Sequence, residues 1–172
     1  MREIHVKTAN DYAGIFWPEF VEKDGCVYLQ REWQVNLHNP EKPSESEWDM
    51  NHTHIIDIVK HHLWIEEEPW LDEHHPDWAV ACELGLTMSR MWAAKLLLDF
   101  PRDDFRVYFH GFDPIVRFHK VRDGVPNAVE HQDWFDGIRD GSVVIIDTRT
   151  LRQQIEAPED IDAGASNPQG RQ

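Results

Sequence analysis

Apolar and polar residues alternate most regularly between residues 27 and 37. Apolar side chains occupy nearly every odd position of this stretch, and Arg31 is the single break on the apolar face. A period of two is typical of a strand with one buried face, so the pattern predicts a strand over 27–37. The preceding dipeptide, Asp24-Gly25, is typical of a hairpin turn.

Two weaker β patterns precede this strand. Ile4 and Val6 alternate with polar residues and predict a short N-terminal strand. The aromatic stretch 16–21 contains Pro18, which donates no backbone hydrogen bond, so an edge strand or an irregular extended segment is expected there. Such an edge, or the edge of the hairpin described below, could pair between two copies. A homodimer is therefore one expected assembly.

A helical period replaces the alternation in the middle of the chain. Apolar residues recur every three or four positions through 76–99, with prolines at the first position and shortly after the end. A second helix is expected over 51–64, with Ile55 and Ile58 on its inner face. The Pro-containing stretch 39–47 that precedes it is expected to be a polar loop.

Two short β segments, 105–110 and 115–121, flank a turn-forming Gly-Phe-Asp-Pro sequence and predict a hairpin. One register places four apolar residues on one face of the pair and four polar residues on the other. The pairs in this register are Phe109 with Val116, Val107 with Phe118, Tyr108 with Arg117, and Arg106 with His119. The agreement between both faces favours this register.

The apolar run 142–147 reads as a buried strand and completes the predicted order of elements. This order predicts an α+β fold, with a largely antiparallel sheet of about five or six strands and two main helices packed on one face. We expect a single domain over residues 1–155. Residues 156–172 are rich in Pro, Gly, Ser and Gln, and are expected to form a flexible C-terminal tail.

The composition is strongly acidic, with 32 Asp and Glu against 17 Lys and Arg, for a formal net charge of −15. Such a surface repels phosphate backbones and anionic lipids, which argues against direct nucleic-acid or membrane binding and favours a basic protein partner. The N-terminus lacks the apolar run of a signal peptide, and no stretch reaches the roughly 20 apolar residues of a membrane span. A cytoplasmic location is expected.

Acidic residues are densest between residues 41 and 77, where eleven carboxylates accompany six histidines and three tryptophans. Aromatic rings among carboxylates are suited to receive Lys and Arg side chains of a partner, although the rings could instead close a small core within the chain. The candidate partner-binding residues are Trp48, Trp64, Glu66, Glu67, Glu68, Trp70, Asp72 and Glu73. This pattern, without any catalytic motif, favours a non-catalytic binding protein of the inhibitor or immunity type.

The alternative is a metal-dependent enzyme, hydrolase-like, that uses the His, Asp and Glu residues of 52–75. His54, Asp57 and His61 would lie on one side of the predicted helix, and His74 could add a further ligand. Two imidazoles and one carboxylate are an acceptable set for zinc or another divalent ion. No HExxH motif or nucleotide-binding glycine motif is present, so no other cofactor is expected.

The polar face of the predicted hairpin is the one locally basic region of the sequence. Its four side chains could hold a carboxylate or phosphate, because guanidinium groups bind such anions in a bidentate manner. The alternative is that these arginines pair with carboxylates of the same chain. The anion-binding candidates are Arg106, Tyr108, Arg117 and His119.

Overall fold

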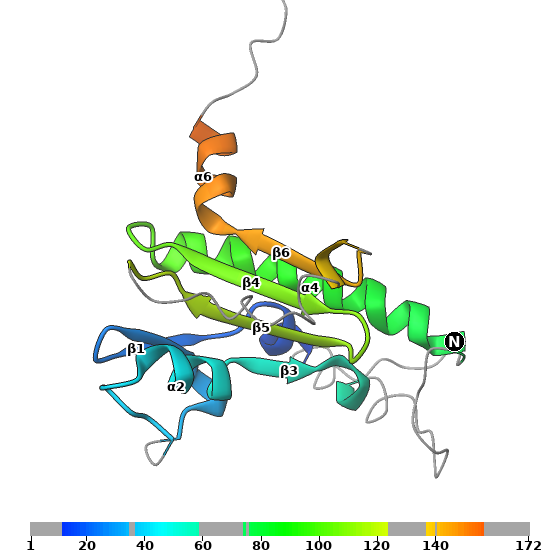
Figure 1. Cartoon of the computed structure of the whole chain (residues 1–172), viewed down its shortest axis with the longest axis horizontal. Coiled ribbons are helices and arrows are strands. Elements are labelled where there is room, and N and C mark those ends of the chain that lie inside the picture. The colour runs from blue at the N-terminus through cyan, green and yellow to red at the C-terminus, as the bar shows by residue number, and fades with distance from the viewer. Residues whose placement is uncertain are drawn as a thin grey trace, which may run out of the picture.

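The computed structural model describes residues 12–34, 37–58, 74, 76–123, 137–139 and 141–156. The fold is α+β, with one four-stranded and one two-stranded antiparallel sheet. Its elements are β1 (Phe20–Lys23), β2 (Cys26–Leu29), the 3-10 helix η1 (Gln30–Glu32), α2 (Pro43–Met50), β3 (His52–His54), α4 (Pro76–Asp99), β4 (Phe105–His110), β5 (Ile115–Lys120), β6 (Val143–Asp147) and α6 (Thr148–Glu156). The larger sheet has the order β3-β5-β4-β6, and the long helix α4 lies along one of its faces (Figure 1).

Helix α4 spans the predicted range 76–99 and supplies one wall of the core. Its buried Trp92 meets the Phe118 ring edge-on, with 6.0 Å between ring centroids, and its indole N–H donates to the carbonyl of Ile15. Gly85 allows the closest approach to the sheet, since a Cβ there would lie 2.3 Å from the ring of Phe109. This face is therefore closed by apolar side chains that fit one another.

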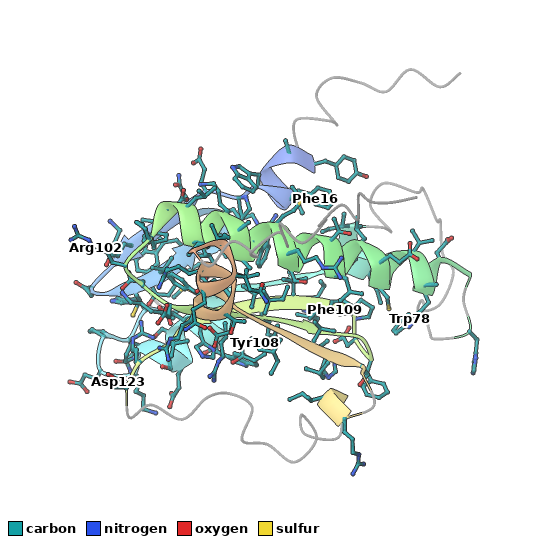
Figure 2. The ribbon with its side chains drawn as sticks, turned by 90° about the horizontal axis from the view of Figure 1, so that it is seen from above. Phe16, Trp78, Arg102, Tyr108, Phe109 and Asp123 are labelled. Atoms are coloured by element: carbon teal, nitrogen blue, oxygen red, sulfur yellow. The ribbon has the colours of Figure 1, made fainter. Side chains whose placement is uncertain are left out.

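The β4–β5 hairpin has the predicted register. All four predicted pairs are present, and they divide the residues between the two faces of the sheet as expected. Phe109 lies on the side of α4, whereas Tyr108 points to the opposite side (Figure 2). The pattern determined the register because a one-residue slip would have moved every apolar residue to the wrong face.

Side chains rather than a strand join the β1–β2 hairpin to the rest of the fold. The carboxylate of Glu47 accepts a hydrogen bond from the backbone N–H of Val27, at 2.9 Å. One helical turn later, the Asn51 amide accepts from the N–H of Leu29 at 2.9 Å and donates to the carbonyl of Val27 at 2.7 Å. Both side chains are fully buried. They satisfy backbone groups of β2 that a neighbouring strand would otherwise have to pair.

Three local predictions need correction. The strand expected over 27–37 ends at Leu29 and is followed by η1. The loop expected over 39–47 contains the start of α2, with Pro43 in its first turn. The helix expected over 51–64 is wrong at its start, because residues 52–54 pair with β5, while 55–58 are helical. Backbone pairing to β5 therefore prevails over the local helical pattern.

The predicted architecture is matched only coarsely. The six strands in the described ranges form two sheets of two and four strands rather than one sheet of five or six. Trp48 of α2 packs on Tyr108, on the face away from α4, so these two helices lie on opposite faces. Helix α6 was not predicted. The predicted strand around Ile4 and the tail after Glu156 lie outside the described residues.

None of the helices in the described ranges is both long and apolar enough to cross a membrane.

Candidate functional site

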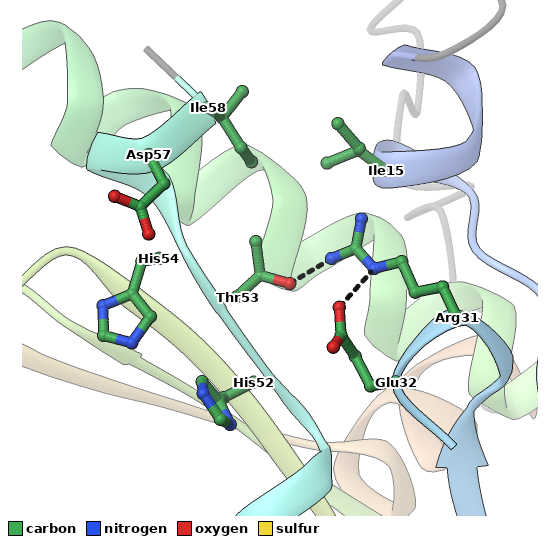
Figure 3. Close-up of a pocket in the computed structure, with 8 residues that line it drawn as sticks. All are labelled: Ile15, Arg31, Glu32, His52, Thr53, His54, Asp57 and Ile58. Carbon is green, nitrogen blue, oxygen red and sulfur yellow. Dashed lines mark hydrogen bonds and ion pairs between the residues drawn. The ribbon is translucent and has the colours of Figure 1, made fainter. Parts of the chain in front are cut away.

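A pocket of about 370 Å³ lies beside β3, between this strand and η1 (Figure 3). Its volume falls within the range of roughly 300–1,000 Å³ that is typical of ligand sites. Six of its eight described lining residues have polar side chains. The lining residues are Ile15, Arg31, Glu32, His52, Thr53, His54, Asp57 and Ile58.

Arg31 and Glu32 form the wall on the η1 side. The guanidinium Nε of Arg31 lies 3.3 Å from a carboxylate oxygen of Glu32, and its Nη2 donates to the hydroxyl of Thr53. These contacts hold the guanidinium in place, as Figure 3 shows. The 3-10 turn directly after β2 is what aims both side chains at β3 rather than along a continued strand.

His52 and His54 form the opposite wall, together with Asp57. The two histidines are two positions apart on β3, so their side chains lie on the same face of the strand. Their ring centroids are 5.4 Å apart, and the rings are nearly perpendicular, at 83°. Nδ1 of His54 lies 3.9 Å from a carboxylate oxygen of Asp113. Imidazoles and carboxylates thus share one side of the pocket.

The surroundings of His52 favour its neutral form. Burial lowers its pKa, and the charges of Arg117 and His54 lower it further. Its Nδ1 is buried and has no hydrogen-bond partner among the residues that the structure describes. This nitrogen is covered by the surrounding atoms of the chain and is not open to the pocket.

Backbone groups of β3 also face outward from the sheet. The N–H of Phe118 donates to the carbonyl of Asn51, and the N–H of Ile55 donates to the carbonyl of Pro114. In an antiparallel ladder with this register, the backbone groups of the alternate residues, His52 and His54, point away from β5. The pocket therefore lies along the outer edge of the sheet.

The four anion-binding candidates come together on the sheet face next to this pocket. Arg117 pairs with His52 across the ladder and lies over the Trp48 ring, with its guanidinium carbon 5.0 Å from the ring centroid. It also donates to the backbone carbonyl of Trp48 at 3.3 Å. Burial lowers the pKa of Arg117, while Asp113 and Asp49 oppose that shift.

The other three candidates are largely closed to an external anion. Only 1% of Tyr108 and 6% of His119 is exposed, and both rings contact Trp48. Arg106 pairs with Asp147 at 3.2 Å, as the alternative interpretation expected. Burial raises the pKa of Tyr108 to about 12 and, together with nearby Arg106 and Arg122, lowers the pKa of His119 to about 4. This face therefore packs mainly against the chain itself.

The metal-binding candidates do not share a helix, because His54 lies in β3. His61 lies outside the described residues, and His74 is described as exposed. Within the ranges that the structure describes, no group of three or more His, Cys, Asp or Glu side chains is placed to hold a metal ion. The metal-dependent alternative for 52–75 stays a prediction about the remaining residues of that cluster.

Of the partner-binding candidates, only Trp48 lies in the described ranges, where it is half-buried. The pocket residues Arg31 and Glu32 were missed by sequence reasoning. The signal for them was the charged residue on the apolar face of the predicted strand, which marked the end of β2. No family model, no curated protein and no solved structure matches the chain.

Proposed function

We propose that this protein is a non-catalytic acidic binding protein that docks on a basic protein partner, in the manner of an inhibitor or immunity protein. The observation that carries the proposal is the excess of carboxylates, 32 against 17 basic residues. Exposed carboxylates and a pocket with charged lining residues occur together beside β3. No catalytic motif competes with this interpretation.

The cations of the described residues are largely used inside the fold. Arg122 binds both oxygens of the buried Glu47, at 2.7 Å each. Arg106, Lys120, Arg149 and Arg152 also form ion pairs with carboxylates of the chain. These five cations pair with four carboxylates, because Arg149 and Arg152 share Asp104, and the surplus negative charge is left to the remaining carboxylates.

Several of these remaining carboxylates border β3. Asp49, Asp57 and Asp113 are exposed. The charges of Asp113 and Asp49 raise the pKa of Arg117, at the edge of the pocket. A negative surface of this kind accelerates the encounter with a cationic protein, by roughly 10-fold to 1,000-fold at low salt. Half-buried Trp48 is an aromatic side chain of the type that anchors interfaces.

The experiment uses the full chain, immobilised and exposed to an extract of the cells that make it. A protein retained by the column is then purified, and its association rate is measured over a range of salt concentrations. We expect a protein of basic isoelectric point whose association slows at least tenfold between low and high salt. Retention of only neutral or acidic proteins, or a rate independent of salt, would contradict the proposal.

Two double variants with the same loss of charge test where the docking surface lies. Asp49→Asn combined with Asp113→Asn removes two charges beside β3, whereas Glu22→Gln combined with Glu83→Gln removes two exposed charges from β1 and α4. Both variants change the net charge equally. The first should slow association more than the second, because steering depends on charges near the contact surface. Equal effects would place the docking surface elsewhere.

A further inference from the structure

The pocket beside β3 carries negative charge on two opposite walls. Glu32 lies on the η1 side and Asp57 on the β3 side (Figure 3). Among the lining residues that the structure describes, Arg31 is the only cationic side chain, and Glu32 already pairs with it through one oxygen. The described lining therefore holds two carboxylates and one guanidinium. An entering anion would be repelled and an entering cation attracted.

Hydrogen-bond acceptors surround the same space. A carboxylate accepts through both oxygens, and only one oxygen of Glu32 has a described ion-pair partner. The carbonyls of His52 and His54 lie on the outer edge of β3, where they can accept further hydrogen bonds. A ligand with several donors, held in a fixed geometry, suits this set of acceptors.

The pocket also offers apolar surface to the stem of a long side chain. Ile58 is buried and Ile15 half-buried, and both line the pocket at the end away from His52 (Figure 3). Long basic side chains bury their methylene groups against apolar surface while the charged group contacts polar atoms. The pocket offers both surfaces, because Ile15 and Ile58 can contact the methylene groups while Glu32 and Asp57 contact the charged group.

We propose that the pocket beside β3 receives an arginine side chain of the basic partner, with its guanidinium held between Glu32 and Asp57. This inference rests on the proposed function and names its point of recognition. Arginine fits better than lysine because its planar guanidinium carries five N–H donors in a fixed arrangement, which can reach acceptors on both walls. The lysine ammonium has three donors on a compact charge.

The test uses N-acetyl-arginine methylamide as the probe and N-acetyl-citrulline methylamide as its neutral, nearly isosteric control. Proton NMR at pH 7.5 follows the imidazole resonances of His52 and His54 in the full chain, assigned with His52→Gln and His54→Gln variants. We expect saturable shifts with the arginine probe, with a Kd in the millimolar range, about what one side chain in an open pocket provides. The citrulline probe should leave these resonances unchanged.

Substitutions of Glu32 and Asp57 test whether these carboxylates bind the arginine probe. Asp57→Asn should weaken probe binding about threefold, and Glu32→Gln combined with Asp57→Asn about tenfold, since a partly exposed ion pair contributes modestly. Glu22→Gln, an exposed acid on β1, is the matched control and should have no effect. Asp57 is itself exposed, so its substitution leaves the fold intact.

The possible outcomes distinguish failure of the arginine pocket from failure of the proposed function. Equal shifts with citrulline, shifts confined to other histidines, or no saturation up to about 100 mM probe overturn the arginine pocket. If the purified partner still binds with strong salt dependence, only the pocket inference fails. If the association rate of every retained protein is independent of salt, the proposed function fails as well, whatever the probe does.

Discussion

The two faces of the four-stranded sheet are held by different forces, although they are built from the same strands. On one face, Val107 and Phe109 of β4 pack with Phe118 of β5 beneath α4. On the other, Tyr108 and His119 lie among arginines and under the ring of Trp48. The first face is mainly apolar, and the second buries groups that can change charge.

This difference separates two kinds of stability. Apolar packing depends on shape and volume and is nearly independent of pH. A buried ion pair or a buried neutral imidazole depends on its partners and on its protonation state. We therefore expect substitutions under α4 to act equally at all pH values, whereas the α2 side should respond to charge and acid. Three predictions test this division, from the largest expected effect to the smallest.

Trp92→Ala should have the largest effect, because it empties the centre of the apolar face. Trp92 is fully buried, and its loss also leaves the carbonyl of Ile15 without its indole donor. We expect the free energy of unfolding to fall by about 3–5 kcal/mol, measured by urea denaturation. Leu98→Ala on the same helix, where the side chain is 67% exposed, should change it by less than about 0.5 kcal/mol. Similar losses for both variants would show that α4 does not form the core.

Glu47→Gln tests the polar side. The Glu47 carboxylate is fully buried and binds Arg122 along with the N–H groups of Val27 and Lys120. Removing its charge leaves the Arg122 guanidinium without compensation, for an expected loss of about 3 kcal/mol in urea denaturation. The control is Glu45→Gln, two residues earlier on α2, where the pair with Lys42 is exposed and contributes about 0.5 kcal/mol or less. A Glu47→Gln protein as stable as the control would refute a structural role for this pair.

Acidification should weaken the polar face through His119. Its pKa in the folded protein, about 4, lies below the usual 6.5, so the unfolded chain takes up a proton first as the pH falls. Stability is therefore complete above about pH 6.5 and declines toward pH 4, by about 2–3 kcal/mol between pH 7 and pH 4.5. Urea denaturation at both pH values measures the decline.

His119→Phe is the matched comparison for this decline, because it keeps a ring and removes the titration. Other titrating groups act in both proteins, so the difference between the two declines isolates His119. The variant should lose about 2–3 kcal/mol less than the wild type between the two pH values. Identical declines would show that His119 is protonated equally in the folded and unfolded states.

The sequence was most informative where interactions are local. The range of α4 and the register of the β4–β5 hairpin were predicted correctly, because helical spacing and strand alternation each act over a few residues. The same register brought Arg106, Tyr108, Arg117 and His119 onto one face, as predicted. That these side chains are mostly covered by Trp48 followed only from the position of α2.

The stretch from 39 to 58 shows where local patterns fail. Glu47 is one of the eleven carboxylates of the acidic stretch 41–77, yet it is buried against Arg122, 75 positions away. The apolar Ile55 and Ile58 were correctly expected to be buried. The strand before them, 52–54, exists because β5 offers backbone partners. Neither Arg122 nor β5 can be identified as a partner from the sequence of 39–58 alone.

By itself, the sequence determined the α+β class, the long helix, the central hairpin and the strong negative charge, because composition and short periodicities encode them. The tertiary structure decided which charges are buried in pairs, where β2 ends, and which residues line the pocket beside β3. Those features depend on contacts between residues far apart in the chain. Their free energies arise only when desolvation and pairing occur together in the folded molecule.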